Sequence, residues 1–186
     1  MHGDRSVADA RSHRFENLAS EVYEPLQRYV SRRVNPDDVD DIVSETMLTL
    51  WRRLDDVPPN ARLPWAYGVA RRHVANHRRF GLRHLRLLRR AQAEPRSLPV
   101  SDNPLDAELH TALAALDEPD RELLRLWAWE QLHPAEIAVV LGLTPNAVSI
   151  RLHRAKRKLG ENLQVARKNE MLSGHSHPES SKEERP

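Results

Sequence analysis

The 186-residue sequence contains no cysteine. This absence excludes a disulfide framework and thiolate metal sites, and it is compatible with a reducing cytoplasm. No apolar run approaches the roughly 20 residues that a membrane-spanning helix needs, and residues 1–14 are too polar for a signal peptide. We therefore expect a soluble protein that works in the cytoplasm.

The sequence also lacks the motifs of common enzyme classes. It has no GxGxxG, Walker loop or HExxH sequence and no serine or cysteine nucleophile motif. No stretch alternates apolar and polar residues as a strand does. His73 and His77 stand at i and i+4, but the arginines around them disfavour a cation, and no nearby carboxylate in that helix completes a site. We expect an all-α protein that is not an enzyme and holds no cofactor and no metal.

Charge is abundant but segregated along the chain. Lys and Arg number 29 against 27 Asp and Glu, yet residues 35–57 hold seven acids and two bases. Residues 62–96 then hold ten Arg and one Glu, and residues 102–122 return to seven acids and one base. Alternating blocks of this kind indicate two basic faces for nucleic acid, with acidic faces turned elsewhere.

Residues 133–159 form the most informative stretch, because they read as two short helices with a tight break. The apolar residues of the first helix recur at i, i+3 and i+4, at Ile137, Val140 and Leu141. Gly142 stands where a glycine ends a helix in the left-handed conformation. Thr144 can cap the second helix, and Pro145 suits its first position.

The second of these helices is strongly basic. Residues 145–168 contain seven Lys or Arg and one acid, Glu161. Val148, Leu152 and Leu159 turn toward a core, whereas the polar residues face outward: Asn146, Ser149, Arg151, Arg154, Lys156, Arg157 and Lys158. The pattern predicts a helix-turn-helix that binds DNA, and the alternative is a helical hairpin with a solvated basic face.

The first half of the chain begins with a loose polar tail at residues 1–13 and turns helical from Phe15. The clearest amphipathic helix covers residues 37–57, with an apolar face at Val39, Ile42, Val43, Met47, Leu50, Trp51 and Leu54. Asp40, Asp41, Ser44 and Glu45 lie away from that face. The alternative for these four is an ordinary solvated acidic face on a core helix.

Pro64 starts a third helix, in which Trp65, Val69, Val74 and Phe80 can be buried. Trp65 and Tyr67 precede a run of arginines, a combination that holds single-stranded nucleic acid through stacking and phosphate contacts. The alternative places both aromatic residues in the core.

The second half begins after residues 91–102, which carry two prolines and no periodicity and therefore read as a linker. The next helix starts at Asn103–Pro104 and turns four leucines inward: Leu105, Leu109, Leu113 and Leu116. Residues 169–186 retain no apolar face, so we expect disorder there.

Three blocks in this order resemble bacterial RNA polymerase sigma factors of the extracytoplasmic-function (ECF) group, in the sigma-70 family: DVDDIVSETMLTLW, LPWAYGVARRHVANHRR and ALDEPDRELLRLWAWEQLHPAEIAVVLGLTPNAVSIRLHRAKRKL. The resemblance implies two small helical domains. Region 2 would cover residues 14–90 and bind core polymerase and the minus-ten element. Region 4 would cover residues 103–168 and bind the minus-thirty-five element through the helix-turn-helix.

The resemblance also implies roles for particular residues. Major-groove contacts to the minus-thirty-five element would come from Asn146, Ser149, Ile150, His153 and Arg154, and backbone contacts from Arg151, Lys156 and Arg157. Minus-ten binding and melting would involve Asn60, Arg62, Trp65, Tyr67, Arg71, Arg72, Arg78 and Arg79, with the loop at 54–63 receiving a flipped base. Core polymerase would dock on Asp40, Asp41, Ser44 and Glu45. Ser149 and His153 differ from the family's usual occupants, so the promoter sequence stays open.

The expected partners are core RNA polymerase, through its β′ clamp helices and β flap, promoter DNA and an anti-sigma factor. We expect a monomer outside the polymerase complex, at the bacterial nucleoid. Two rival hypotheses remain. One is a stand-alone helix-turn-helix regulator that does not bind polymerase, and the other is an interaction protein or a degenerate sigma factor that binds core but not promoters.

Overall fold

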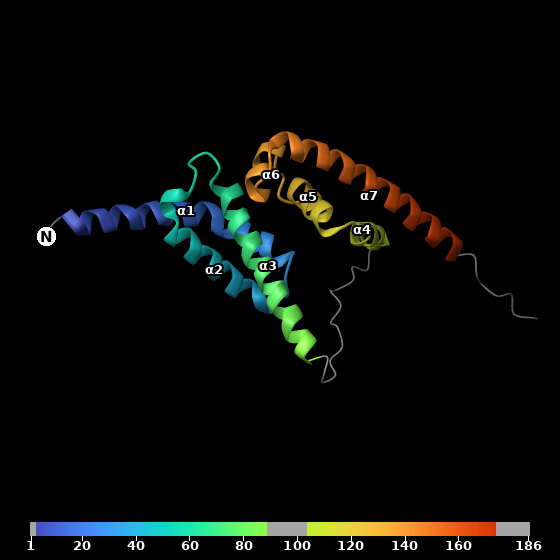
Figure 1. Ribbon diagram of the computed structural model, residues 1–186, viewed down its shortest axis with the longest axis horizontal. Coiled ribbons are helices and arrows are strands. Elements are labelled where there is room, and N and C mark those ends of the chain that lie inside the picture. Colours follow the sequence, from blue (N-terminus) through green and yellow to red (C-terminus); the bar gives the residue numbers. More distant parts are fainter. Residues whose placement is uncertain (1–2, 89–103, 174–186) are drawn as a thin grey trace, which may run out of the picture. The chain divides into compact units, whose positions relative to one another are not determined.

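The computed structural model describes residues 3–88 and 104–173, and within these ranges every regular element is a helix (Figure 1). The elements are α1 (Gly3–Ser31), the 3₁₀ turn η1 (Pro36–Asp38), α2 (Val39–Arg52), the 3₁₀ turn η2 (Leu54–Asp56), α3 (Arg62–Leu88), α4 (Pro104–Ala114), α5 (Glu118–Ala128), α6 (Pro134–Leu141) and α7 (Pro145–Ser173). The predicted all-α class is confirmed. The predicted linker at 91–102 lies outside the described residues, as does the end of the chain from residue 174.

No single helix of the described ranges is long and apolar enough to cross a membrane. By length and composition alone, only the bent pair of α6 and α7 meets that test.

Contacts divide the chain into two compact units. The first unit is Met1–Arg96 with Leu126–Val148, and the second is Ser97–Arg125 with Ser149–Pro186. The predicted boundaries instead place residues 103–168 together. The two divisions differ because α6 packs against α3 inside the first unit.

The core of the first unit forms where α1, α2 and α3 pack pairwise against one another (Figure 1). Apolar side chains at threes and fours along each helix supply it, as the sequence pattern predicts: Val22, Leu26 and Tyr29 from α1, Ile42, Val43 and Leu50 from α2, and Val69 and Val74 from α3. Phe80 is a correction. We expected it to be buried, but its side chain is 72% exposed near the end of the packed part of α3.

Helix α1 begins well before the position expected from the sequence. The prediction of a loose tail at residues 1–13 is wrong for most of that segment, because α1 starts at Gly3. The reason is tertiary contact. Phe15 meets the edge of Trp51 at 5.1 Å between ring centroids, and the Arg11 guanidinium lies over the same ring at 5.2 Å. These contacts stabilise a polar helix that its own periodicity does not predict.

Helix α6 approaches α3 at a glycine. A Cβ atom at Gly68 would stand 3.4 Å from the carbonyl oxygen of Val140, at the lower limit of ordinary van der Waals contact. The backbones of the two helices therefore lie close together at this crossing. The side chain of Val140 is itself buried.

In the second unit, Arg121 caps the end of α4. Its guanidinium donates hydrogen bonds to the carbonyl oxygens of Leu113, Ala114 and Leu116 at 2.9, 2.9 and 2.6 Å. These carbonyls belong to a helix terminus, where the helix itself supplies no donor. Asp117 then caps α5, since its Oδ1 accepts a hydrogen bond from the Asp120 N–H at 2.9 Å.

Helix α7 contacts α4 along its second half. Asn162 donates to the Ala112 carbonyl oxygen at 3.1 Å, and Arg167 pairs with Glu108 at 3.0 Å. Two expectations fail here. Leu109 is 38% exposed, while the small Ala112 fills the buried position, and α7 continues to Ser173, five residues past the predicted end of the domain.

Candidate nucleic-acid interface

The turn between α6 and α7 has the local geometry that the sequence predicts. Gly142 ends α6 with φ 67° and ψ 38°, the left-handed conformation that suits glycine. The Thr144 hydroxyl accepts a hydrogen bond from the Ala147 N–H at 3.2 Å, so it caps α7, which begins at Pro145. The chain bends by 102° at this turn, within the range of helix-turn-helix motifs.

A further cap at the start of α6 was not predicted. The Glu136 carboxylate accepts a hydrogen bond from the His133 N–H at 2.8 Å. A Glu three residues after the capping position is the acidic half of a capping box, so the sequence did carry this signal.

One side of α7 is exposed and carries the predicted DNA-reading set. Val148, Leu152 and Ala155 are buried. The exposed residues include all eight for which the family resemblance implies a contact with DNA: Asn146, Ser149, Ile150, Arg151, His153, Arg154, Lys156 and Arg157. Residues three and four apart share a helix face, so the structure brings Asn146, Ile150 and His153 into one row. Ile150 is 46% exposed and offers an apolar contact surface within this row.

Arg157 and Lys158, at the middle of α7, make contacts within the protein. Arg157 Nε lies 3.5 Å from Glu161 Oε1. Lys158 pairs with Asp120 of α5, and that hydrogen bond raises the pKa of the lysine. Lys158 therefore helps to fix α7 on α5, whereas the predicted anchors Arg151, Lys156 and Arg157 keep exposed side chains, with Arg157 beside Glu161 of the same helix.

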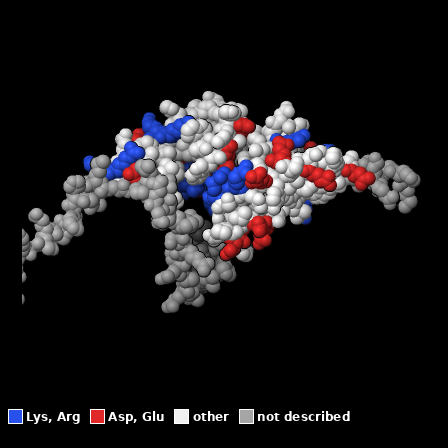
Figure 2. Space-filling model, turned by 180° about the vertical axis from the view of Figure 1, so that it is seen from behind, with Lys and Arg blue, Asp and Glu red and all other residues white. Residues whose placement is uncertain are grey.

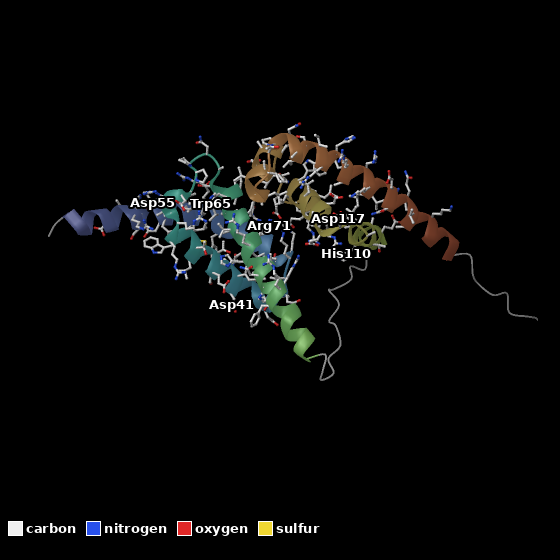
Figure 3. The ribbon with its side chains drawn as sticks, in the orientation of Figure 1. Asp41, Asp55, Trp65, Arg71, His110 and Asp117 are labelled. Carbon is white, nitrogen blue, oxygen red and sulfur yellow. The ribbon has the colours of Figure 1, made fainter. Side chains whose placement is uncertain are left out.

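The acidic residues of α2 form an exposed surface. Asp40, Asp41, Ser44 and Glu45 occupy two neighbouring i, i+4 rows, and each is exposed. Figure 3 labels Asp41 near the start of α2, whereas Asp55 lies in η2, beyond the other end of that helix. Figure 2 shows that acidic and basic side chains gather in patches of one sign on the face drawn.

Leu48 belongs to the same surface and was missed by the sequence analysis. Its side chain is 48% exposed, four residues after Ser44 and three after Glu45. The signal was available, because Leu48 falls on the polar side of the amphipathic pattern. We call Asp40, Asp41, Ser44, Glu45 and Leu48 the α2 surface.

Two histidines of α3 contact α2 and the 3₁₀ turn before it. His73 Nδ1 lies 3.1 Å from Glu45 Oε2 and its Nε2 lies 2.9 Å from the Thr49 hydroxyl, while His77 Nε2 lies 3.2 Å from Asp38 Oδ2. Within the described residues, no group of three or more His, Cys, Asp or Glu side chains is arranged to hold a metal ion.

The predicted minus-ten set divides in the structure. Asn60, Arg62, Arg71, Arg72, Arg78 and Arg79 are exposed. Trp65 is partly exposed beside the Arg53 guanidinium, which lies 5.2 Å from its ring centroid (Figure 3). The exposed arginines include Arg71 at the middle of α3. These groups offer one aromatic ring and several cations along the same helix.

Tyr67 does not join that surface. Its side chain is only 3% exposed and its ring stacks on Tyr29 at 4.9 Å between centroids. This burial contradicts the predicted stacking role and agrees with the alternative of a core position. Burial, followed by the negative charge of Glu130, raises the pKa of Tyr67 to about 12. The opposing arginines are the smaller influence.

We expect Tyr67 to titrate about two pH units above an ordinary tyrosine. The folded protein keeps the phenol protonated while the unfolded chain ionises near pH 10. Its contribution to stability is therefore present below pH 10 and is lost as the pH rises toward 12. Tyrosinate absorbance, taken as the difference between the wild type and Tyr67→Phe, measures the midpoint. A midpoint near pH 10 would show that the ring is solvent-accessible.

A pocket of about 350 Å³ lies between α1 and the loop at residues 54–63. Arg14, Asn17 and Leu18 line it from α1, and Leu54, Val57, Pro59 and Arg62 line it from the opposite side. The loop was predicted to receive a flipped base. The wall from α1 was not predicted, because nothing in the sequence relates residue 14 to residue 57.

The fold and these surfaces define a class of protein: a helical DNA-binding protein with a basic helix-turn-helix and a separate acidic surface. Comparison with known proteins names the family. The family model "Sigma-70 region 2" matches residues 15–91, and "Sigma-70, region 4" matches residues 106–159.

The chain is similar to curated sigma factors over most of its length. It is 32% identical over 142 residues to the RNA polymerase sigma factor NccH of Alcaligenes xylosoxydans xylosoxydans, covering 70% of this chain and 76% of the relative. It is 31% identical over 173 residues to the RNA polymerase sigma factor CarQ of Myxococcus xanthus, covering 86% and 97%. The chain belongs to the ECF group of the sigma-70 family.

Solved structures agree on the fold. CnrH in complex with the cytosolic domain of CnrY is 29% identical, with a TM-score of 0.58 over 85% of this chain and 94% of that chain. RpoE in complex with the anti-sigma factor NepR, from Bartonella quintana, has a TM-score of 0.62 over 81% and 97%, at 21% identity.

Proposed function

We propose that this chain is a transcription initiation factor that binds core RNA polymerase, directs it to specific promoters and helps to melt the DNA. The observation that carries this proposal is the presence of two unlike exposed surfaces in one chain. The basic face of α7 suits duplex DNA, and the acidic α2 surface suits a basic protein partner. A stand-alone regulator needs the first surface only, and the named relatives also favour the sigma factor.

We assign the reading of the minus-thirty-five element to α7. Arg154 is exposed on its outer face, and a guanidinium can bond guanine O6 and N7 together, so it is the base reader. Asn146, Ser149, Ile150 and His153 complete the groove-facing row. Arg151, Lys156 and Arg157 bond phosphates, which positions the helix without specifying sequence.

Minus-ten binding is assigned to the exposed groups around α3. Trp65 supplies a stacking surface, and Arg71, Arg72, Arg78 and Arg79 neutralise phosphates. Asn60 and Arg62 belong to the loop beside the pocket. Tyr67 is left out of this set because its ring is buried. Separating a base from its stack costs a few kcal/mol, which stacking and a fitted pocket offset.

The α2 surface is assigned to core polymerase, in particular to the β′ clamp helices. Its carboxylates provide steering and register, and Leu48 adds an apolar contact at the centre of the charged rim. RpoE is solved in complex with the anti-sigma factor NepR, and CnrH in complex with the cytosolic domain of CnrY. We therefore include in the proposal an anti-sigma partner that covers these surfaces. The site of action is the bacterial nucleoid.

Two experiments test the proposed function. Core polymerase is pulled down with the purified chain, and transcription from a promoter library is then measured with the reconstituted enzyme. Core binding with initiation at a defined set of promoters supports the proposal. Duplex binding without core binding would establish the stand-alone regulator, and core binding without initiation would establish a degenerate sigma factor.

Arg154→Ala is expected to cost about 1–3 kcal/mol at one position of the minus-thirty-five element. The loss is confined to that position because the alanine removes a base contact and leaves phosphate contacts in place. Lys156→Ala is the matched variant on the same helix. It should weaken all promoter sequences alike and lower the salt dependence. Binding to a set of single-base promoter variants measures both, and a sequence-selective loss with Lys156→Ala would contradict the division of roles.

A further inference from the structure

The N-terminal half of α1 makes a group of contacts that the proposed function leaves unused. Arg11 and Arg14 stand three residues apart on one face of α1. Arg11 Nη1 donates to Asp55 Oδ2 at 2.9 Å, and Arg14 Nη1 donates to Asp55 Oδ1 at 3.0 Å. The Asp55 carboxylate, in the middle of η2, is therefore held on both oxygens by the same helix.

Arg11 also holds the end of α2. Its Nη2 donates to the Trp51 carbonyl oxygen at 2.8 Å, in the last turn of α2, where carbonyl groups lack helical donors. One guanidinium thus bonds both the end of α2 and Asp55 in η2. The ring of Trp51 is enclosed between Arg11 and Phe15.

An ion pair with α1 holds the other end of the loop at residues 54–63. Arg62 Nη1 lies 3.2 Å from Glu21 Oε2, two turns further along α1. The pocket of about 350 Å³ lies between the Asp55 contacts and the Arg62–Glu21 ion pair, with Arg14, Asn17 and Leu18 of α1 as one wall. The shape of the pocket depends on how the loop is held against α1.

We propose that Arg11 and Arg14 are positioning residues that hold the loop on α1, and that Asn17 is a specificity-determining residue in the pocket between them. The ligand class is an unstacked nucleobase of the melted strand. An amide offers one acceptor and two donors to the edge of such a base. The inference rests on the proposed function, and it makes the start of α1 part of the minus-ten site.

The proposal distinguishes two kinds of residue. Arg11 does not line the pocket, so its loss changes selectivity only through the loop. Asn17 lines the pocket and reaches the base itself. The pKa of Asp55 lies below its ordinary value because of the hydrogen bonds from Arg14 and Arg11, so the carboxylate is charged at the pH of the experiment.

The test uses the complete chain bound to core polymerase. Templates carry each of the four bases at each position of the minus-ten element, in a preopened duplex, and binding is measured for the wild type, Arg11→Gln, Asp55→Asn and Asn17→Ala. We expect Arg11→Gln and Asp55→Asn to reduce the ratio between the best and worst base by about three- to tenfold at one position only. The double variant Arg11→Gln/Asp55→Asn should lose no more selectivity than either single variant, because both substitutions break the same hydrogen-bond network.

Asn17→Ala should reduce selectivity at the same position. The control is Arg28→Gln, which breaks the exposed Arg28–Glu24 pair on the same helix and should leave the whole profile unchanged. Thermal unfolding and core affinity, measured on the same samples, should be close to wild type for every variant.

Selectivity unchanged in Arg11→Gln and Asp55→Asn would overturn the proposal, as would a uniform loss at every position. A loss confined to Asn17→Ala would overturn the positioning role of the arginines. Failure of the wild type to bind core polymerase would instead reject the proposed function, so the two failures are distinguishable.

Discussion

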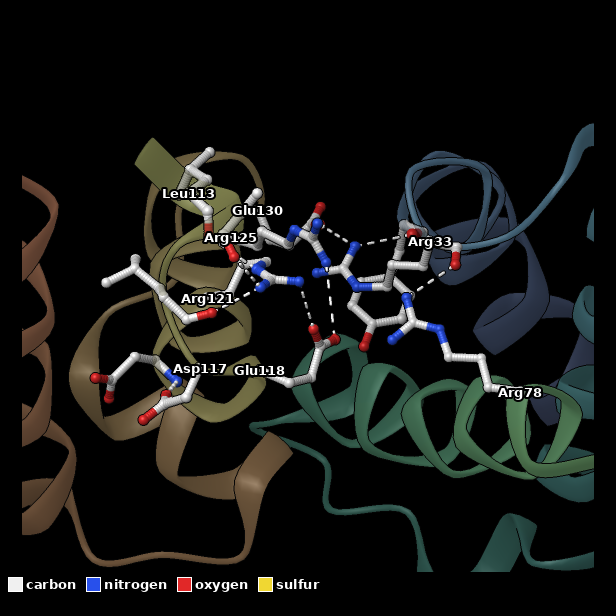
Figure 4. Close-up of polar contacts among 12 residues, drawn as sticks. Arg33, Arg78, Leu113, Asp117, Glu118, Arg121, Arg125 and Glu130 are labelled. Atoms are coloured by element: carbon white, nitrogen blue, oxygen red, sulfur yellow. Dashed lines mark hydrogen bonds and ion pairs between the residues drawn. The ribbon is translucent and has the colours of Figure 1, made fainter. Parts of the chain in front are cut away.

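Replacing Glu130 by alanine is expected to lower the free energy of unfolding by about 3–5 kcal/mol. The side chains of Glu130 and Arg33 are each 2% exposed, and Arg33 Nη1 lies 3.0 Å from Glu130 Oε1 (Figure 4). Removing the carboxylate takes the Glu130 charge away from a buried guanidinium. Arg32 also bonds Glu130, through the other carboxylate oxygen, so the variant loses two charge-assisted contacts.

The rest of the site explains why Arg33 cannot move out to water at little cost. Its guanidinium lies 3.6 Å from the ring centroid of Tyr29, and its Nη1 also donates to the Tyr29 carbonyl oxygen at 2.8 Å. Arg78 Nη2 donates to the Arg33 carbonyl oxygen at 2.9 Å, which fixes the backbone beneath it (Figure 4). These contacts hold Arg33 in place independently of Glu130.

Urea denaturation of three variants measures the effect. The double variant Arg33→Met/Glu130→Leu removes both charges and should recover most of the stability lost by Glu130→Ala, since apolar pairs often replace buried ion pairs without loss. Glu24→Ala breaks an exposed pair with Arg28, whose side chain is 55% exposed, and should cost less than about 1 kcal/mol. A Glu130→Ala cost as small as that of Glu24→Ala would mean that the pair is open to solvent.

This ion pair also marks the limit of sequence reasoning. Local signals were read correctly: the glycine after α6, the hydroxyl cap of α7 and the buried Ile42, Val43 and Leu50 of α2. Each depends on residues within a few positions of one another. Arg33 and Glu130 stand 97 residues apart, and no periodicity or cap relates them. The contact between Arg11 and Asp55, and hence the true start of α1, is hidden for the same reason.

Tyr67 is a different case, because the sequence did contain the answer. Trp65 and Tyr67 are two residues apart, so a helix turns them to nearly opposite sides. The two rings therefore cannot face the same strand of DNA. In the structure, Tyr67 is buried against Tyr29, while Trp65 stays partly exposed. Helical geometry applied to this pair would have separated the core residue from the surface residue.

Reversing two charges on the α2 surface is expected to weaken binding to core polymerase by about 100-fold or more. In Asp41→Arg/Glu45→Arg, two exposed carboxylates one turn apart become cations on the surface that we assign to core polymerase. Like-charge contacts at an interface cost several kcal/mol, and about 1.4 kcal/mol corresponds to a factor of ten in affinity. Titration of fluorescently labelled core polymerase at physiological salt measures the change.

The charge-matched control is Asp37→Arg/Asp9→Arg, which reverses two exposed carboxylates outside the α2 surface and should change affinity less than about threefold. Duplex binding through α7 should be unaltered in both variants, because none of the four residues lies on that helix. Equal weakening by the two double variants would show that net charge alone governs the encounter. In that case α2 would be an ordinary solvated helix, and the assignment of its carboxylates to polymerase would be wrong.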